Sequence, residues 1–177
     1  MASRPAAAKP PVTTIYIVRH AEKDPTAGAT DPALTPAGEA RARLLAQRLA
    51  RRHPAALFTT DTRRTRATLA PWPRPPACVP QAYEAQHPDA LASRIHQEYA
   101  GKTVVVVGHS NTPLPLLKAL GVQPALTEIK DAEYDYLFQV ALRPNKPARL
   151  RVSHYGAAPV ATPAAAGRPV GQMRQWG

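Results

Sequence analysis

The sequence has few cysteines and few acidic residues. Among its 177 residues there is a single cysteine, Cys78, and 12 Asp or Glu residues stand against 23 Lys or Arg. One thiol cannot form an internal disulfide, and no group of thiols is present to hold structural zinc or an iron–sulfur centre. No stretch approaches the roughly 20 apolar residues that a membrane-spanning helix needs. We therefore expect no metal, no cofactor and a cytoplasmic location, with a periplasmic or exported protein as the alternative if a leader has been removed.

The shortage of acids leaves a formal net charge of +11, and much of this charge is local. The segment 41–74 contains nine arginines and one acidic residue, Asp61. Such a segment attracts phosphate-bearing ligands of any size, but it is equally typical of a solvated helix face in a sequence rich in Ala, Arg and Pro. We interpret four of these residues as exposed groups that steer anions at long range: Arg41, Arg48, Arg51 and Arg52.

Apolar runs alternate with helical patterns through the middle of the chain. We expect one domain over 14–156, flanked by an N-terminal tail at 1–13 and an Ala/Pro/Gly-rich C-terminal tail at 157–177. Strands are predicted at 15–18, 55–59, 77–79, 103–107, 137–142 and 150–153. Helices are predicted to follow: the first begins at Pro36 and includes Leu49, and the others lie at 61–70, 88–99 and 112–120. This alternation indicates the α/β class: a three-layer α/β/α sandwich with a mostly parallel sheet and an antiparallel edge formed by the last two strands.

The start of the first helix is signalled clearly. Thr35 is a suitable N-cap, Pro36 fits the first helical position, and Glu39 lies in the first turn. An inner stripe with spacings of four, three and four is formed by Gly38, Ala42, Leu45 and Leu49.

Polar residues follow the predicted strands at the edge where parallel sheets bind ligands. Arg19 and His20 follow the first strand, His109 follows the strand at 103–107, and Arg64 falls in the first turn of the second helix. Guanidinium groups match the geometry of a phosphate, and a neutral imidazole is a nucleophile near pH 7. These four residues therefore predict phosphoryl transfer through a covalent intermediate on a histidine.

Four blocks of sequence resemble the histidine phosphatase (phosphoglycerate mutase-like) superfamily over about 14–155. The blocks are Ile15 to Lys23 (IYIVRHAEK), Leu34 to Gly38 (LTPAG), Phe58 to Thr65 (FTTDTRRT) and Val107 to Thr112 (VGHSNT). The resemblance implies phosphomonoester or phosphohistidine hydrolysis without a metal, with His20 as phosphoryl acceptor and Arg19, Arg64 and His109 as phosphate ligands. Ser110 and Asn111 are expected as further substrate contacts. The implied partner is a phosphorylated small molecule or a phosphoprotein, and nucleic acid is not expected.

The chain also departs from the family pattern. Ala21 and Glu22 follow the catalytic histidine where many members have glycine, which is similar to the compact bacterial branch that includes phosphohistidine phosphatases. The large insertions that form substrate lids in mutases are absent, which favours a phosphatase with an open pocket. The acid that protonates the leaving group stays open among Glu22, Glu84 and Asp24.

Two other functions fit parts of the sequence. An arginine-rich module that binds anions or nucleic acid, with a degenerate phosphate pocket, fits the charge. An α/β-hydrolase fits the strand followed by Gly108-His109-Ser110, with Ser110 as nucleophile and His154 as base, although Thr112 stands where the tight elbow needs glycine. The pattern of His20 followed by Glu22 also fits a zinc deaminase. That enzyme class needs a downstream Pro-Cys-x-x-Cys motif, and only Cys78 is present.

Overall fold

The computed structural model describes residues 11–26, 28, 30–72 and 78–158. In this part of the chain six strands form one sheet in the order β3-β2-β4-β1-β5-β6. The strands are β1 (Thr13–Arg19), β2 (Ala56–Thr59), β3 (Gln81–Ala82), β4 (Thr103–Gly108), β5 (Tyr136–Arg143) and β6 (Lys146–His154). The helices are α1 (Pro36–Leu49), the short 3-10 helix η1 (Ala50–Arg52), α2 (Arg63–Leu69), α3 (Pro88–Glu98) and α4 (Pro113–Ala119).

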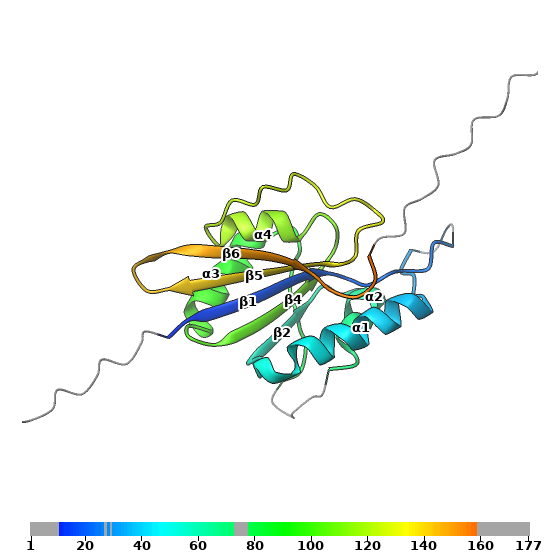
Figure 1. Cartoon of the computed structure of the whole chain (residues 1–177), viewed down its shortest axis with the longest axis horizontal. Helices are drawn as coiled ribbons and strands as arrows, with labels where there is room; N and C mark the ends of the chain where they lie inside the picture. Colours follow the sequence, from blue (N-terminus) through cyan, green and yellow to red (C-terminus); the bar gives the residue numbers. More distant parts are fainter. Residues whose placement is uncertain (1–10, 27, 29, 73–77, 159–177) are drawn as a thin grey trace, which may run out of the picture.

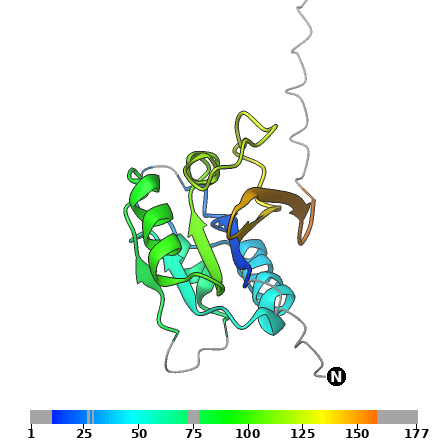
Figure 2. The same ribbon diagram turned by 90° about the vertical axis from the view of Figure 1, so that its left-hand side faces the viewer.

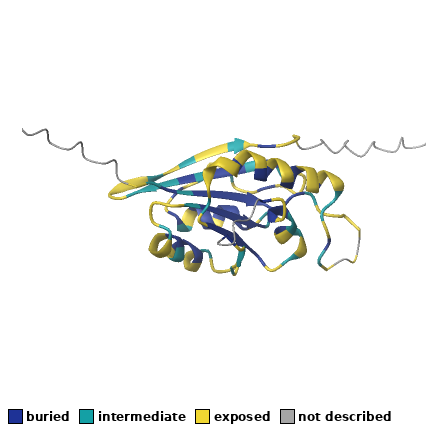
Figure 3. Ribbon diagram, turned by 90° about the horizontal axis from the view of Figure 1, so that it is seen from below, coloured by how far each residue is buried: buried dark blue, intermediate teal, exposed yellow. Residues whose placement is uncertain are grey.

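The first four strands in this order are parallel, and β5 and β6 add an antiparallel edge. One apolar cluster lies between the sheet and α3 and α4, and includes Ile17, Phe58, Ile95 and Leu117. A second cluster lies on the opposite face with α1 and α2, and includes Leu45. Figures 1 and 2 show these helix pairs on the two faces of the sheet, and Figure 3 shows that burial is concentrated in the strands between them. The expected α/β sandwich with an antiparallel edge is therefore confirmed.

Helix α1 begins as its sequence predicts. The Thr35 side chain accepts a hydrogen bond from the Gly38 N–H at 3.1 Å, Pro36 occupies the first turn, and the predicted inner stripe is buried. Gly38 also lies against the segment that follows His20: a Cβ atom at this position would be 2.2 Å from the Glu22 carbonyl oxygen. The absent side chain lets α1 pack directly on the chain next to the nucleophile candidate.

The strand predicted at 77–79 is wrong at Cys78 and Val79, and Ala77 lies outside the described residues. Cys78 is a buried loop residue whose thiol contacts the Pro54 carbonyl oxygen at 3.4 Å, and Val79 is exposed. The strand pairing occurs after Pro80, where Gln81 and Ala82 pair with β2. A buried loop residue produced the apolar signal here, while the observed strand is only two residues long and contains the polar residue Gln81.

Several further boundaries differ from the predictions: α2 begins at Arg63 rather than at 61, for example, with Thr62 as its N-cap. Strand β6 begins at Lys146 rather than at 150, because its first residues alternate exposed and half-buried positions on an edge strand. Thr13, which was predicted to end the N-terminal tail, is the first residue of β1. Of the two predicted tails, the structure otherwise describes only residues 11–12 and 157–158, which lie outside strands. The remainder of both predicted tails lies outside the described residues.

Candidate active site

His20 is held at the end of β1 by two backbone hydrogen bonds. Its N–H donates to the Gly108 carbonyl oxygen at 2.8 Å, which ties it to the end of β4. Its ring Nδ1 is 2.7 Å from the carbonyl oxygen of Ala21. A carbonyl can only accept, so Nδ1 carries the proton and a neutral ring keeps its free electron pair on Nε2. The backbone therefore selects the tautomer in which Nε2 is the nucleophilic atom.

The surroundings of His20 keep its ring neutral. The residue is 3% exposed. Burial, together with the nearby charges of Arg19 and Arg64, lowers the pKa of His20 to about 3, although the hydrogen bond to Ala21 acts in the opposite direction. The imidazole consequently remains an unprotonated nucleophile throughout the physiological pH range.

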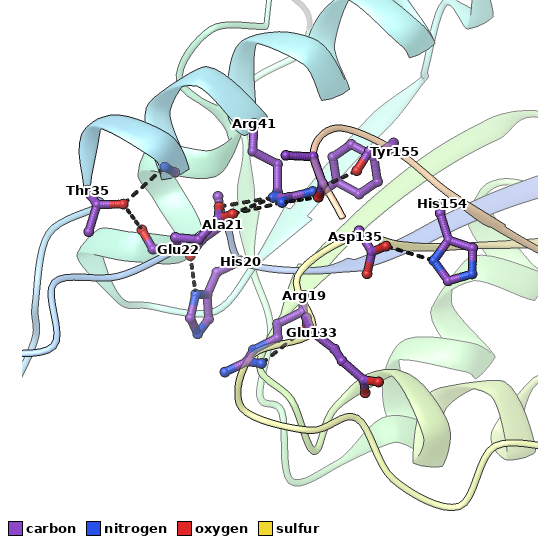
Figure 4. A network of polar contacts seen from close by, with 12 residues as sticks. Arg19, His20, Ala21, Glu22, Thr35, Arg41, Glu133, Asp135, His154 and Tyr155 are labelled. Atoms are coloured by element: carbon purple, nitrogen blue, oxygen red, sulfur yellow. Dashed lines mark hydrogen bonds and ion pairs between the residues drawn. The ribbon is translucent and has the colours of Figure 1, made fainter. Parts of the chain in front are cut away.

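Arg19 is buried beside His20 and is fixed by a loop from the distant part of the chain (Figure 4). Its Nη1 donates to the carbonyl oxygens of Lys130, Asp131 and Glu133 at 3.0–3.2 Å. The guanidinium carbon lies 4.1 Å from the centre of the Tyr134 ring. Burial is the main reason why the pKa of Arg19 is lowered, but a guanidinium stays charged at neutral pH.

Arg64 and His109 come from two other segments and contact each other. The Arg64 Nη2 atom is 3.3 Å from His109 Nδ1, and Asp31 pairs with Arg64 Nη1 at 3.3 Å. Because the guanidinium can only donate, His109 Nδ1 accepts and a neutral ring carries its proton on Nε2, 2.9 Å from the Thr60 hydroxyl. The rings of His20 and His109 have centroids 5.6 Å apart in an edge-to-face arrangement. The four predicted residues therefore lie together at one edge of the sheet.

The site concentrates positive charge and has free donors. Burial and the charges of Arg64 and Arg19 lower the pKa of His109. Among the described residues, the buried Nε atoms of both Arg19 and Arg64 lack a hydrogen-bond partner. A buried guanidinium N–H without an acceptor is costly. An anion such as phosphate placed beside these groups would supply the acceptors that the two Nε atoms lack.

Glu22 lies in a different environment from these four residues (Figure 4). Its carboxylate accepts three contacts from Arg41 Nε and Nη2 at 2.8–2.9 Å. Arg41 also donates to the carbonyl oxygens of Tyr155 at 2.6 Å and Ala157 at 2.7 Å. Burial alone would lower the pKa of Arg41, but the hydrogen bonds and charge of Glu22 outweigh it and raise this pKa. The expectation that Arg41 is an exposed steering residue is therefore wrong: it is 4% exposed and joins α1 to both ends of the domain.

The remaining candidates lie around the four central residues rather than among them. Asp24 is exposed, and its Oδ1 accepts the Thr26 N–H at 2.9 Å. Glu84 is exposed after β3 and borders a cavity of about 320 Å³ with Tyr83, His87 and Arg94. Ser110 and Asn111 line another cavity of about 320 Å³, together with Lys118 and Glu128.

Three residues that support the site carry no clear signal in the sequence. Asp31 binds Arg64, Thr60 binds His109, and Tyr134 stacks on Arg19. Asp31 also accepts the Arg63 N–H with both carboxylate oxygens at 3.0 Å, which fixes the first turn of α2. Thr60 falls within a family-like block and could have been identified there. Asp31 and Tyr134 lie in irregular segments, where no periodic pattern indicates their direction.

The arrangement does not support Ser110 and His154 as a hydrolase pair. His154 ends the edge strand β6, where its Nδ1 contacts Asp135 Oδ2 at 2.9 Å. Ser110 follows β4, and both β1 and β5 lie between these two strands. Three strand spacings amount to roughly 14 Å. This separation is too great for direct proton transfer between the two side chains.

Two structural features bear on the wider class of the protein. In the described ranges, His, Cys, Asp and Glu side chains do not gather in groups of three or more that could hold a metal ion. None of the helices described is both long and apolar enough to span a membrane.

Comparisons with known proteins agree with this geometry. The model of the histidine phosphatase superfamily (branch 1) matches residues 15–81, which contain Arg19, His20 and Arg64. No curated protein matches the chain.

Among solved structures, the protein histidine phosphatase SixA complexed with tungstate is similar with a TM-score of 0.64 and 16% identity, over 80% of this chain and 96% of that one. A mycobacterial glucosyl-3-phosphoglycerate phosphatase is similar with a TM-score of 0.63 and 16% identity, over 83% and 100%. Its complex with inorganic phosphate gives a TM-score of 0.58 and 18% identity, over 82% and 97%. The chain is therefore similar to branch 1 of the histidine phosphatase superfamily over residues 15–81, and over most of its length it shares the fold of these solved phosphatases.

Proposed function

We propose that this phosphatase hydrolyses a phosphomonoester or a phosphohistidine through a covalent intermediate on His20, without a metal. The observation that supports this most directly is the pairing of a fixed His20 Nε2 with two arginines whose buried Nε atoms lack hydrogen-bond partners within the described residues. The guanidinium groups would bind the phosphoryl oxygens and offset the charge that develops on them during transfer.

The reaction would proceed in two balanced steps. In the first, His20 Nε2 forms a bond to phosphorus, the bond from phosphorus to the leaving oxygen or nitrogen breaks, and the leaving atom gains a proton. In the second, water attacks phosphorus and gives a proton to the carboxylate that protonated the leaving atom. The bond from phosphorus to Nε2 breaks, orthophosphate is released, and His20 is restored with its proton on Nδ1. The Ala21 carbonyl stays 2.7 Å from Nδ1 and would stabilise the positive charge that the ring carries while it is phosphorylated.

Among the three carboxylates considered as proton donor, we propose Glu84. Glu22 is occupied by Arg41 through three contacts, and Asp24 accepts hydrogen bonds from its own loop. The Glu84 carboxylate makes no hydrogen bond within the described part of the chain. The residue follows Tyr83, whose hydroxyl donates to the Val107 carbonyl oxygen at 3.3 Å near His109. Glu84→Gln should lower turnover and remove the limb of the pH profile that reports the acid, whereas Glu22→Gln should leave the shape of that profile unchanged. If Glu22→Gln removed this limb of the pH profile and Glu84→Gln did not, Glu22 would be the proton donor.

Trapping the intermediate tests the proposed nucleophile. Rapid quenching with a labelled monoester should yield a phosphoenzyme that is labile in acid and stable in alkali, as a P–N bond is. His20→Ala should lose both the label and turnover, because no neighbouring group can replace the ring in line with the leaving atom. Ser110→Ala is the matched control and should retain both. An acid-stable label that disappears in Ser110→Ala would overturn the assignment.

Chelation tests the absence of a metal requirement. Turnover of p-nitrophenyl phosphate should survive treatment with EDTA, because the two arginines supply the charge that a metal would otherwise provide. Loss of turnover that a divalent ion restores would contradict this part of the proposal. A panel containing phosphohistidine peptide, sugar phosphates and nucleotides would then identify the substrate class.

A further inference from the structure

A second cluster of arginines lies on the face of the sheet that carries α1. Arg48 and Arg52, from the end of α1 and from η1, line a cavity of about 170 Å³ together with Arg151 of β6. The polar side chains of Gln139 and Ser153 also line it. This cavity is separate from the site at His20, since none of the four central site residues borders it.

The strand register explains why these side chains meet. Tyr16 of β1 pairs with Gln139 of β5, and Gln139 pairs with Arg151 of β6, so the three residues form one row across the sheet. Arg149 and Ser153 lie two residues before and after Arg151, and therefore share its face of the strand. The row through Tyr16 lies four residues before His20, which is roughly 13 Å along β1.

The arginines of this cavity have no acidic partners. All 12 acidic residues of the chain fall within the described residues, yet none forms an ion pair with Arg48, Arg52 or Arg151. The contacts of Arg48 in this part of the chain are the His154 carbonyl oxygen at 3.0 Å and the Ser153 hydroxyl at 3.4 Å. By contrast, Arg41, Arg43, Arg64, Arg66 and Arg94 each pair with a carboxylate. Arginines that line one cavity without counter-charges repel one another, and a bound anion would offset this repulsion.

We propose that this cavity is a second anion site that takes a diphosphate group. Three guanidinium groups line it, so a group with about three negative charges balances them, whereas a single phosphate leaves excess positive charge. Its volume equals that of about six water molecules at roughly 30 Å³ each, which suits a small inorganic group rather than a nucleobase or an acyl chain. The amide of Gln139 supplies a neutral donor beside the charges, whereas the Ser153 hydroxyl donates to the Leu137 carbonyl oxygen at 3.4 Å.

The test uses the full chain labelled with ¹⁵N and titrated with sodium pyrophosphate. The backbone amides of Gln139 and Ser153 report on this cavity, and those of Ala21 and His109 report separately on the site at His20. We expect shifts at both places, with different affinities. The affinity at Gln139 and Ser153 should fall as NaCl is raised, because exposed charges are screened.

Two double variants separate this site from the general positive charge of the protein. Arg52→Gln/Arg151→Gln should weaken pyrophosphate binding at Gln139 and Ser153 by at least tenfold and leave the shifts at Ala21 and His109 unchanged. Arg43→Gln/Arg66→Gln removes the same charge from exposed positions elsewhere and should leave both sets of shifts unchanged. Arg48 is left intact because it also binds the end of β6.

Further titrations identify the chemical class of the ligand. A titration with ADP shows whether the diphosphate group can also bind as part of a nucleoside diphosphate. Shifts at Gln139 and Ser153 with either ADP or pyrophosphate support the site. Orthophosphate should bind at least tenfold more weakly than pyrophosphate, and equal binding would contradict a diphosphate site. Absence of shifts at Gln139 and Ser153 at millimolar pyrophosphate would overturn the proposal, as would shifts that persist in Arg52→Gln/Arg151→Gln. Binding to vesicles of phosphatidylglycerol without any response to pyrophosphate would indicate a membrane surface instead.

Discussion

The buried pair between Arg41 and Glu22 should contribute more to stability than any ion pair on the surface of α1. Arg41 is 4% exposed and bonds to the Glu22 carboxylate and to two backbone carbonyls. Replacing it by methionine keeps the apolar stem but leaves a largely buried carboxylate and two carbonyls without their donor. Breaking a buried pair in this way costs about 3–5 kcal/mol. The Glu22 side chain is 23% exposed, so water can solvate it in part, and we expect a loss of about 3 kcal/mol.

Equilibrium unfolding in urea measures this loss as a lower urea concentration at the midpoint of the transition, provided that the dependence of the unfolding free energy on urea (the m value) does not change. Arg43→Met is the matched control, because Arg43 is on the same helix with a 57% exposed side chain, 4.0 Å from Glu39. It should cost less than about 0.5 kcal/mol. In the double variant Arg41→Met/Glu22→Gln, the losses should be less than additive by at least about 1 kcal/mol, since the two residues contact each other. If Arg41→Met cost no more than Arg43→Met, the assignment of Arg41 as a structural residue would be refuted.

Three further predictions concern the active site and its support. The pKa of His20 is about 3 in the folded chain and about 6.5 in the unfolded chain. Between these pH values the unfolded state therefore binds more protons than the folded state. On account of this residue, the free energy of unfolding should fall by about 2 kcal/mol from pH 7 to pH 5. His20→Asn should flatten that part of the stability profile in urea titrations, and an unchanged slope would contradict a neutral buried ring. Gly38→Ala should cost at least about 2 kcal/mol despite the better helix propensity of alanine, because its Cβ would overlap the Glu22 carbonyl oxygen; a stabilised variant in thermal unfolding would show that the loop moves freely. Asp31→Asn should raise the Kd for orthophosphate about tenfold while the fold persists, since Arg64 loses the carboxylate that orients it; calorimetry with unchanged affinity would argue against that role.

The order of secondary structure and the central residues of the site could be predicted because both depend on local sequence. The β-branched runs in β1 and β4 fix two buried strands, and Arg19, His20 and His109 follow them directly. Parallel strands end at the same edge, so the juxtaposition of these residues follows from topology. The capping residue Thr35 likewise fixes the start of α1.

The parts that could not be predicted depend on contacts between distant segments. The arginine pattern of α1 does not distinguish Arg41, which is buried, from Arg43 and Arg48, which are exposed. Its burial results from the meeting of α1 with Glu22 and with the chain after β6. In the same way, Cys78 is buried because it packs against the second apolar cluster from a loop, and not because it belongs to a strand. Periodicity predicts which face of a helix or strand is apolar, but it does not predict which polar side chain is buried with a hydrogen-bonding partner.

The loop that fixes Arg19 has a consequence for the order of events during synthesis. The carbonyl oxygens that hold its guanidinium belong to residues 130–133, more than 110 positions later in the chain. Strand β1 is likewise completed only by β4 and β5, which follow it by roughly the same span. His20, the proposed nucleophile, is thus among the first parts of the domain to be translated and among the last to be organised. A nascent chain that ends before residue 130 carries His20 without its arginine in place, and we expect it to be inactive. Closure of such long loops also predicts slow folding for a domain of this size.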